Sequence, residues 1–482
     1  MDVSRVIKSI QGIVRKDAGV DGDAQLIGQL SWLIFLKIFD AQEENLEFEQ
    51  ENYREPIPSQ YLWRNWAKDK EGMTGDELLD FVNSKLFPNL KEMVAPINVN
   101  PRGFVCSEVF VDAFNYMKNG TLLRQVINKL NEINFTDSKE RHTFGDIYEQ
   151  ILKNLQAAGK SGEFYTPISI TKFMVDMVNP QLYEMIMDPA CGTGGFLTCA
   201  FNHVKDNFVK TANDHQVLQN QIHGVEKKHL PHLLCTTNML LHGIEVPVQI
   251  RHDNTLSRPL KSYSSSDRVD VVITNPPFGG QEEDCIESNF PDSLQTRETA
   301  DLFLVFIIHL LKDGGRAGIV LPDGTLFGEG VKTRIKEKLL EECNLHTIVR
   351  LPNGVFSPYT GIKTNLLFFT KGEQTKDVWY YEHPYPEGYK SYSRSKPLTI
   401  NEFEPEKKWW NDRKENEFAW KVSKEQIKDR GYNLDIKNPN RPEDSLGDPN
   451  ELLANHKLLL KEIADTRTQL KAELVKALGG KS

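Results

Sequence analysis

The sequence has few cysteines, and none of them stand in a short paired motif. Six Cys are spread over 482 residues without a C-x-x-C pair. Because disulfide frameworks and zinc sites need closely spaced ligands, we expect free thiols and no metal. One trio, His229, His232 and Cys235, shares a helical face, but ordinary helices offer such trios far more often than metal sites do. The six thiols are Cys106, Cys191, Cys199, Cys235, Cys285 and Cys343.

Long apolar runs are also missing. A membrane-spanning helix needs at least about 18 apolar residues in succession. The best candidates, residues 26–39 and 302–311, are shorter or contain Lys37, so we expect both to be buried helices. The first five residues do not begin a basic segment followed by an apolar block, as a secretory leader would. These absences favour a cytoplasmic protein that does not enter a membrane.

An excess of basic residues is lacking as well. The chain has 58 Lys and Arg against 68 Asp and Glu, a formal net charge of −10. Affinity for duplex DNA comes largely from neutralising phosphates. The chain as a whole is therefore not a basic protein that wraps nucleic acid, although a local basic face is compatible with this charge.

The first region of the chain, residues 1–140, has the pattern of an all-helical domain. Apolar residues recur at helical intervals from position 26 to 38 and again from 122 to 133. Trp63 and Trp66 stand near basic residues, an arrangement that would suit stacking on nucleic acid. Packing in the core is the favoured interpretation of both side chains. At this length, two or three domains are expected in all.

Residues 141–440 alternate between strand-like and helix-like segments. This alternation predicts an α/β domain with a doubly wound, mainly parallel, Rossmann-like sheet that is covered on both faces. In such a sheet, ligands bind at the carboxyl ends of the strands. Asp188, Glu226, Asp253 and Asn275 all stand at such ends, so we expect them to meet. The predicted strands are residues 186–188, 222–226, 248–251, 269–274, 316–321, 347–351 and 365–370, of which the last two are expected to form an antiparallel hairpin at the edge.

A glycine-rich loop follows the first predicted strand. It runs from Asp188 through Gly192, Thr193 and Gly194 to Gly195, where a helix is expected to begin. Glycines let backbone N–H groups approach a ligand closely, with the helix N-terminus behind them. The dinucleotide pattern G-x-G-x-x-G and the phosphate-loop pattern G-x-x-x-x-G-K-[ST] are both absent, so the loop taken alone is weak evidence for any particular ligand.

Two acids at later strand ends fit the same ligand. The carboxylate of Glu226 can accept hydrogen bonds from both ribose hydroxyls of an adenosine, and Asp253 belongs to a polar cluster suited to an adenine amine. Taken by itself, Glu226 is explained equally well as a solvated acid at a strand end.

The segment Asn275-Pro276-Pro277-Phe278 indicates the chemistry. Each proline fixes φ, and the first holds Asn275 extended, so the Asn275 side-chain oxygen and the Pro276 carbonyl form two rigid acceptors. Together they can hold one exocyclic NH2 group and draw its lone pair out of ring conjugation toward an electrophile. Phe278 offers a flat face for the ring to stack on. In isolation, the segment would also fit a strand-terminating turn beside a core aromatic residue.

The glycine loop, the strand-end Glu and the Asn-Pro-Pro-Phe segment, in this order, resemble an amino-group DNA methyltransferase that uses S-adenosylmethionine. More narrowly, the chain resembles the modification subunit of a type I restriction-modification system over nearly its whole length. The stretches that carry the narrower resemblance are residues 31–37, 144–149, 162–167, 320–324, 362–365 and 431–435.

The resemblance implies further contacts with S-adenosylmethionine. In this family a loop that precedes the glycine loop packs over the methionine part of the cofactor. The glycine-loop contacts Thr193, Gly194 and Gly195 carry over as well, as does Glu226. The residues of this chain that match the covering loop are Glu163, Phe164, Tyr165, Thr166, Pro167 and Ile168.

The function implied is direct methyl transfer to the N6 nitrogen of an adenine that has been turned out of duplex DNA. No covalent enzyme intermediate is expected, so Cys191 is not assigned as a nucleophile. The loop alone leaves N4-cytosine methylation open, although those enzymes more often carry Ser-Pro-Pro-Tyr. Protein-glutamine methylation, usually by smaller chains, is a second alternative, and a non-catalytic scaffold that binds cofactor and DNA is a third.

Partners are implied too. An acidic chain that modifies DNA without a long insertion for reading bases indicates another protein that recognises the sequence. In the family that protein is a specificity subunit flanked by two modification subunits, and a restriction and translocation subunit is expected to join them.

Residues 441–482 are predicted to form a helical tail that docks on the specificity subunit. Asp448, Pro449 and Glu451 make a helix start signal, and an apolar stripe runs from position 453 to 474. Packing of this stripe on the chain's own body is an equal alternative.

Two internal segments also have two interpretations each. Residues 280–300 predict either a lid over a flipped base or an acidic surface loop. The aromatic and basic clusters at 379–381 and 407–410 predict either a lining for the DNA path or, as the favoured interpretation, ordinary packing of a small C-terminal subdomain.

Overall fold

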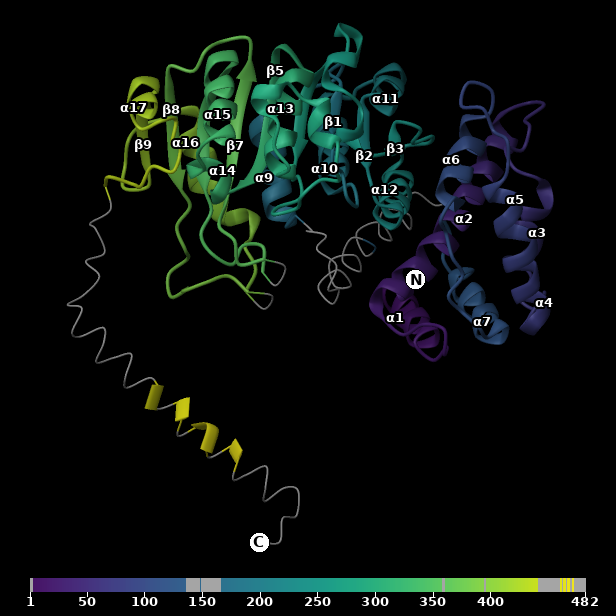
Figure 1. The fold of residues 1–482 in the computed structure, drawn as a ribbon. Helices are drawn as coiled ribbons and strands as arrows, with labels where there is room; N and C mark the ends of the chain where they lie inside the picture. The colour runs from purple at the N-terminus through teal and green to yellow at the C-terminus, as the bar shows by residue number, and fades with distance from the viewer. Residues whose placement is uncertain are drawn as a thin grey trace.

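The computed structural model of this chain describes residues 3–135, 148, 166–357, 360–393 and 396–440, with single positions between 460 and 471. A helical part and an α/β part built on one sheet lie side by side (Figure 1). Within these described ranges, no helix is both long enough and apolar enough to cross a membrane. The predicted α/β class with a helical N-terminal region is confirmed.

The helical part is organised around the long helix α2. Every residue of α2 from Leu26 to Glu43 is buried, as expected for a helix that is surrounded by others. The buried Lys37 donates to the carbonyl oxygens of Leu130 and Ile133, so its charge has partners inside the core. The helices of this part are α1 (Val3–Val14), α2 (Asp23–Glu49), α3 (Trp63–Trp66), α4 (Gly75–Asp80), α5 (Phe87–Lys91), α6 (Pro101–Phe110) and α7 (Gly120–Leu130).

Trp63 and Trp66 belong to this core. Their exposed fractions are 3% and 5%, and the two rings contact each other edge to face with centroids 5.3 Å apart. The core interpretation is therefore confirmed, and neither ring is available for stacking on nucleic acid.

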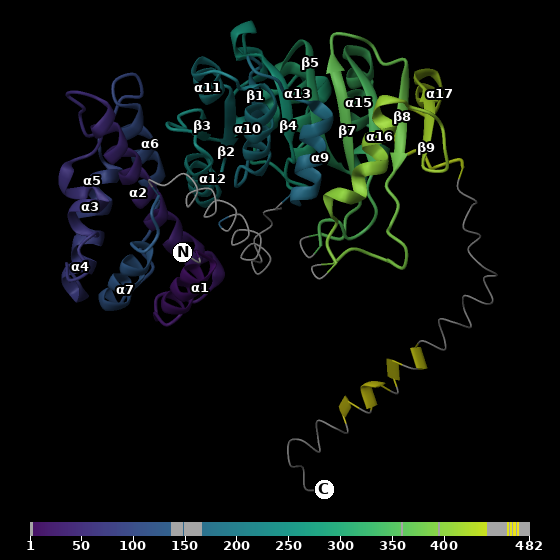
Figure 2. The same ribbon diagram turned by 180° about the vertical axis from the view of Figure 1, so that it is seen from behind.

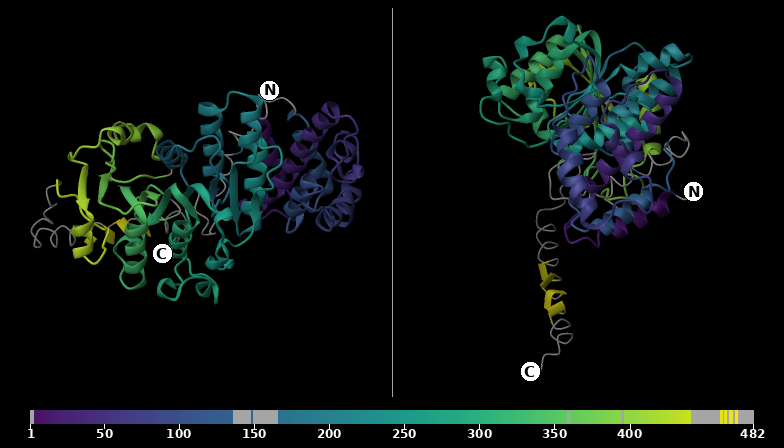
Figure 3. Two further views of the ribbon diagram at one scale, coloured as in Figure 1. Left: turned by 90° about the horizontal axis from the view of Figure 1, so that it is seen from above. Right: turned by 90° about the vertical axis from the view of Figure 1, so that its right-hand side faces the viewer.

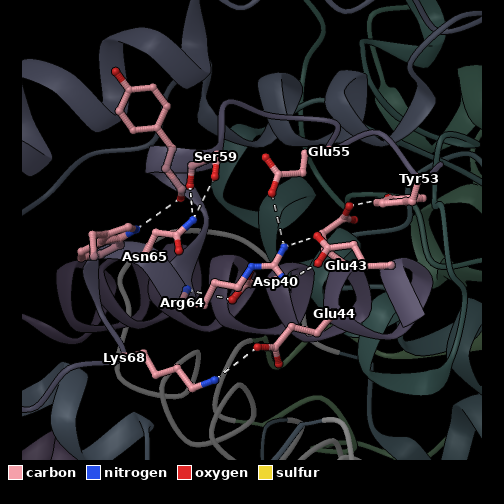
Figure 4. A network of polar contacts seen from close by, with 12 residues as sticks. Asp40, Glu43, Glu44, Tyr53, Glu55, Ser59, Arg64, Asn65 and Lys68 are labelled. Carbon is pink, nitrogen blue, oxygen red and sulfur yellow. Dashed lines mark hydrogen bonds and ion pairs between the residues drawn. The ribbon is translucent and has the colours of Figure 1, made fainter. Parts of the chain in front are cut away.

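A network of charged side chains fixes α2 to the segment that follows it (Figure 4). The backbone N–H of Arg64 donates to Asp40 at 2.8 Å, and the Arg64 guanidinium pairs with Glu47. Lys68 pairs with Glu44 at 3.3 Å on the outside. Burial raises the pKa of Asp40 to about 6, because desolvation outweighs the attraction of Arg64. These contacts set the direction in which α3 leaves α2.

The α/β part contains a sheet of nine strands among the described residues, in the order β3-β2-β1-β4-β5-β7-β6-β8-β9. Strands β1 to β5 run parallel, and β7 lies antiparallel between β5 and β6. The strands are β1 (Ile186–Asp188), β2 (Ile222–Glu226), β3 (Ile250–His252), β4 (Val269–Thr274), β5 (Leu311–Pro322), β6 (Cys343–Arg350), β7 (Thr364–Lys371), β8 (Asp377–Glu382) and β9 (Ala419–Ser423).

The predicted hairpin of β6 and β7 is antiparallel but is not at the edge of the sheet. Strand β8 pairs in parallel with β6, and β9 pairs antiparallel with β8 and forms the edge of the sheet. The sequence pattern missed both strands because their aromatic residues resembled those of a separate subdomain. Tyr380 stacks on Trp420 at 5.2 Å, and Tyr381 packs edge-on against Trp409 at 5.1 Å. The aromatic clusters therefore belong to the sheet core, and the predicted lining of a DNA path is wrong for these buried rings.

Helices cover both faces of the sheet (Figures 2 and 3). The alternation along β4 agrees with this, because Val271 and Ile273 belong to the core that contains residues of α9, α10 and α16. Val272 belongs to the core that contains residues of α13 and α15. The helices of this part are α9 (Ile168–Val178), α10 (Gly195–Phe208), α11 (Ala212–Gln219), α12 (His229–His242), α13 (Thr299–Leu310), α14 (Asp323–Phe327), α15 (Val331–Glu342), α16 (Glu404–Asn411) and α17 (Lys424–Asp429).

Helix α12 joins the two parts. Its apolar residues Leu233, Leu234, Leu240 and Leu241 are buried in the same core as the helices of the N-terminal part. Arg102 of α6 strengthens this junction, since its guanidinium donates to the Glu245 carbonyl at 2.9 Å in the loop after α12. The helical part is therefore packed directly against the sheet domain and is not joined to it by a linker alone.

The predicted tail lies mostly outside the described residues, and its start signal at positions 448–451 lies wholly outside them. At the described positions between 460 and 471 the chain is helical, and the side chains of Leu460, Ile463 and Leu470 are exposed.

Arg102 allows a test of the packing at the junction. Its guanidinium contacts Glu43 at 2.5 Å, and the Glu43 side chain is completely buried. Replacing Arg102 by Met leaves this carboxylate without its cation, which should cost about 3 to 5 kcal/mol of stability in urea unfolding.

The surface pair of Lys68 and Glu44 provides the control. Lys68→Met should change stability by less than about 1 kcal/mol, because both side chains are exposed. The combined variant R102M/E43Q should recover much of the lost stability. Equal effects of R102M and K68M would contradict the buried-pair explanation.

Candidate functional site

One cavity lies at the carboxyl ends of β1, β2, β3 and β4. Asp188 and Glu226 are the last residues of β1 and β2, Asp253 follows β3, and Asn275 follows β4. All four line the cavity. Parallel pairing brings these ends to the same edge of the sheet, as the sequence predicted.

The glycine loop between β1 and α10 forms one wall. Gly192 and Gly194 have φ values of +54° and +83°, which L side chains rarely adopt. A Cβ atom on Gly194 would also lie 2.8 Å from the Cys235 sulfur of α12. The loop therefore needs glycine for both its turn and its close packing. Helix α10 begins at Gly195, so its N-terminal N–H groups are directed toward this edge.

Glu226 is fixed by the backbone on both sides of its carboxylate. The Gly192 N–H donates to Oε2 at 2.9 Å, and the Lys228 N–H donates to Oε1 at 2.8 Å. The glycine loop and the end of β2 are thus held together by the same side chain. This carboxylate has one orientation at the cavity wall and is not a freely rotating surface acid.

Asp188 is a buried carboxyl group beside Glu226. Its exposed fraction is 1%, and its Oδ1 accepts from the Thr274 hydroxyl at 2.6 Å and from the Ala190 N–H at 3.1 Å. Burial raises the pKa of Asp188 to about 7, and the nearby charge of Glu226 adds to the increase. A positive charge in the cavity would favour the ionised form of this group.

The Asn275 amide is held in a defined orientation. Its Nδ2 donates to the Thr166 hydroxyl at 2.8 Å. Its Oδ1 is buried and has no hydrogen-bond partner within the described part of the chain. An unsatisfied buried acceptor is costly and requires an explanation. A ligand N–H group would satisfy this oxygen.

The other predicted residues differ in their distance from the cavity. Pro277 lines it, whereas Phe278 is 7% exposed and packs edge-on against Phe356 with centroids 6.1 Å apart. The predicted residues that line the cavity are Thr166, Asp188, Gly192, Thr193, Gly195, Glu226, Asp253, Asn275 and Pro277. The predicted residues that are described but do not line it are Pro167, Ile168, Gly194, Pro276 and Phe278. Glu163, Phe164 and Tyr165 lie outside the described residues.

Some lining residues were not predicted. Phe303 comes from the middle of α13, where nothing distinguishes it from its apolar neighbours in the sequence. Glu282 reaches the rim from the 280–300 loop and pairs with Lys227 at 3.4 Å. That loop is anchored by the buried side chains of Phe290 and Leu294. Phe303 and Glu282 reach the cavity only because segments far apart in the sequence pack together, and no short sequence pattern marks either residue.

Two of the described cysteines, Cys191 and Cys235, lie at the glycine loop. The described cysteines are free, and the Cys191 and Cys235 sulfurs lie 3.8 Å apart beneath the glycine loop. No group of three or more His, Cys, Asp or Glu side chains in these ranges is arranged to hold a metal ion.

Two family models match the chain. The HsdM N-terminal domain model matches residues 3–130, and the N-6 DNA Methylase model matches residues 139–447.

Individual proteins with the same architecture are similar over most of the chain. The EcoEI type I restriction enzyme methylase subunit of Escherichia coli is 66% identical, with 100% of this chain and 99% of the relative covered. The EcoKI methylase subunit of Escherichia coli strain K12 is 30% identical, with 87% and 79% covered. A chain from a structure of type I R-M system assembly and conformational transition is 37% identical with a TM-score of 0.83, covering 99% of this chain and 98% of that chain.

The buried carboxyl of Asp188 should produce a measurable pH dependence of stability. Its pKa is about 7 in the folded chain against an ordinary value of 3.8, so the unfolded chain releases this proton at lower pH than the folded chain does. Stability of the ligand-free protein therefore falls as pH rises through this window. Asp188→Asn removes the titrating carboxyl but keeps an oxygen that can accept from the Thr274 hydroxyl and the Ala190 N–H. Wild-type stability should fall by about 2 kcal/mol between roughly pH 5 and pH 7, and the stability of the variant should not, so the difference between the two proteins should change by that amount.

Calorimetric melting of both proteins at each pH measures this difference. The exposed Asp313→Asn change serves as the control and should give the same offset at both pH values. A pH-independent offset for D188N would contradict the raised pKa.

Proposed function

Because this chain belongs to the N-6 DNA methylase family, as a methylase subunit of the type I restriction enzymes, we propose that its strand-end cavity brings S-adenosylmethionine next to an adenine turned out of duplex DNA. Enzymes of this family take the methyl group from S-adenosylmethionine. The proposal concerns how the residues of this chain bind the two substrates and direct the adenine amine.

The buried Asn275 Oδ1 without a partner is the observation that carries the proposal. The N6 amino group of adenine has two N–H bonds to donate. We assign one to Asn275 Oδ1 and the other to the Pro276 carbonyl, which cannot rotate away because the prolines restrict the backbone. Both bonds pull the nitrogen lone pair out of conjugation with the ring. The lone pair then points out of the ring plane, where it can attack a methyl group.

The Thr166 hydroxyl contacts the nitrogen end of the Asn275 amide, opposite the end that we assign to the adenine. An amide has a donor end and an acceptor end of nearly equal size. Since Nδ2 is bonded to the Thr166 hydroxyl, the acceptor oxygen is the end left for the substrate. Reversal of the amide would present N–H to N–H and repel the amine.

The cofactor-binding residues divide by chemistry. The fixed carboxylate of Glu226 suits the two ribose hydroxyls, and Asp253 beyond β3 suits the adenine amine. The glycine turn leaves room for a ligand to approach the backbone of Gly192 and Gly195. S-adenosylmethionine supplies a cationic sulfonium and thereby an electrophilic methyl group. The acidic side of the cavity around Asp188 favours such a cation.

The target base has to leave the duplex stack before its amine can reach Asn275. We assign Phe278 as the aromatic ring for the extruded adenine, which requires the ring to turn from its buried, edge-on contact with Phe356 toward the cavity. The amine nitrogen would then form its bond to the methyl carbon as the carbon–sulfur bond of the sulfonium breaks, with S-adenosylhomocysteine as the leaving thioether, and the proton lost from nitrogen would pass to solvent.

We further propose that a separate specificity subunit reads the DNA sequence, that two copies of this chain flank it, and that a restriction and translocation subunit can join. The acidic net charge of −10 supports a division of labour in which this chain does not bind DNA alone. The similarity to methylase subunits of type I restriction enzymes supports the same arrangement.

Labelled methyl transfer to DNA tests the proposed function. The chain is assayed alone and with its specificity subunit, and the modified base is identified after digestion. N6-methyladenine that depends on the specificity subunit is expected. Labelled N4-methylcytosine, or cofactor binding without any transfer, would reject the proposal in favour of the other base or of a scaffold.

Substitution of Asn275 by Ala should reduce methyl incorporation by at least about 100-fold, the scale seen when one preorganised polar contact to a reacting group is removed. Cofactor affinity, measured by calorimetry, should stay within a few-fold, because the amide is assigned to the adenine and not to the cofactor. Unchanged incorporation would reject the proposed grip on the amine.

A pair of Thr166 variants tests the orientation of the amide. Thr166→Val keeps the shape but loses the acceptor for Asn275 Nδ2, so kcat should fall roughly 5- to 30-fold, the worth of about one hydrogen bond. Thr166→Ser keeps the hydroxyl and should restore most of the rate. Loss of cofactor affinity in T166V at unchanged kcat would show instead that Thr166 serves only the cofactor.

A further inference from the structure

A second cavity, of about 220 Å³, lies where the helical part meets the sheet domain. Phe104, Val105 and Glu108 of α6 form one wall, and His232 and Thr236 of α12 form another. The third wall comes from residues 247–248 and from 250–253 at β3. Asp253 also lines the first cavity, so the two cavities are neighbours.

Two buried polar side chains of this junction cavity are unsatisfied. His232 and Thr236 are 2% and 1% exposed and stand one helical turn apart on α12. Neither His232 Nδ1 nor the Thr236 hydroxyl has a hydrogen-bond partner in the described part of the chain. Two such orphaned groups in one cavity are unusual in a folded protein, where buried polar atoms are almost always paired.

The protonation of His232 follows from its other contact. Its Nε2 lies 3.0 Å from the Ile250 carbonyl oxygen, which can only accept, so Nε2 carries the proton. Nδ1 is then a bare acceptor. Burial lowers the pKa of His232 to about 4, so the ring is neutral at physiological pH. The Thr236 hydroxyl can donate or accept. A ligand that bonds to both side chains therefore needs an N–H group for His232 Nδ1 and a neighbouring acceptor atom for the Thr236 hydroxyl.

The remaining walls restrict the kind of ligand. Phe104, Val105, Val248 and Ile250 are apolar, and the His252 ring stacks on His232 with centroids 5.2 Å apart, which suits a flat molecule. Glu108 and Asp253 at the rim outnumber the single cation Arg251, so phosphate groups are disfavoured. The edge of a purine base offers a ring N–H or an amino group beside a ring acceptor.

We propose that the junction cavity binds the base of a purine nucleoside, with His232 Nδ1 and the Thr236 hydroxyl as its hydrogen-bond partners. The base lies between α6 and β3, and the sugar faces the rim at Glu108 and Arg251. This site is separate from the methyl-transfer cavity and does not depend on the function assigned there. A nucleoside bound in it touches both the helical part and the sheet domain.

Calorimetric titration with adenosine tests the proposal. The chain is first saturated with S-adenosylhomocysteine, so that the first cavity is occupied. One equivalent of adenosine should then bind, and adenosine monophosphate and N6,N6-dimethyladenosine, which lacks the amino N–H, should bind at least 10-fold more weakly. Failure of adenosine to bind, or its displacement of the S-adenosylhomocysteine, would overturn the second site.

Two neighbouring threonines of α12 give a matched pair of variants. Thr236→Val removes only an orphaned hydroxyl, so the melting temperature of the ligand-free chain should not fall, while adenosine binding should weaken at least 10-fold. Thr237→Val is the control, because the Thr237 hydroxyl donates to the Leu233 carbonyl at 2.8 Å within the helix and does not line the cavity. Its adenosine affinity should match that of wild type.

His232→Phe keeps a flat ring but removes both the Nδ1 acceptor and the Nε2 donor to the Ile250 carbonyl, and it should also weaken adenosine binding at least 10-fold. Binding to T236V and H232F that equals wild-type binding would show that adenosine occupies some other place on the chain. In that case the two orphaned groups are satisfied only by water, and the proposal is wrong.

Discussion

The site depends on the parallel register of four neighbouring strands. Asp188 pairs with Gly224 across β1 and β2, and Met187 pairs with Val272 across β1 and β4. This register aligns the carboxyl ends of the strands. The last residue of each strand, or the residue that follows it, therefore lines the same cavity. A slip of one residue would turn alternate side chains to the other face and separate the acids from Asn275. Gly224 of β2 allows Leu197 of α10 to pack closely against the strand, because a Cβ at position 224 would lie 2.8 Å from the Leu197 side chain.

Several groups at this sheet edge are held at a cost to stability. Asp188 carries a carboxyl group into the interior, and Asn275 leaves an oxygen unsatisfied. The turn through Gly194 needs a positive φ. Such costs are common where a protein is prepared for a ligand that will offset them. A cationic cofactor beside Asp188 and an amine on Asn275 would each remove one of these costs.

Much of this arrangement could be predicted from local patterns. The strand periods, the glycine loop and the proline-fixed Asn275 are short-range features, and each restricts the backbone within a few residues. The position of β7 between β5 and β6 and the addition of β8 and β9 could not be predicted, because strand order is a property of distant pairing. The position of Phe303 in the cavity could not be predicted either, because Phe303 is one apolar residue among many in α13.

The sequence by itself determined which atoms are available, namely the strand-end acids, the glycine turn and an amide beside two prolines, because backbone restriction and side-chain chemistry are local. Only the tertiary structure decided how those atoms are oriented. Thr166 and Asn275 are 109 positions apart, yet their hydrogen bond holds the Asn275 amide at the cavity. Likewise, α12 joins the two parts and leaves His232 and Thr236 unsatisfied. Orientation depends on contacts between remote segments, and these exist only once the chain has packed.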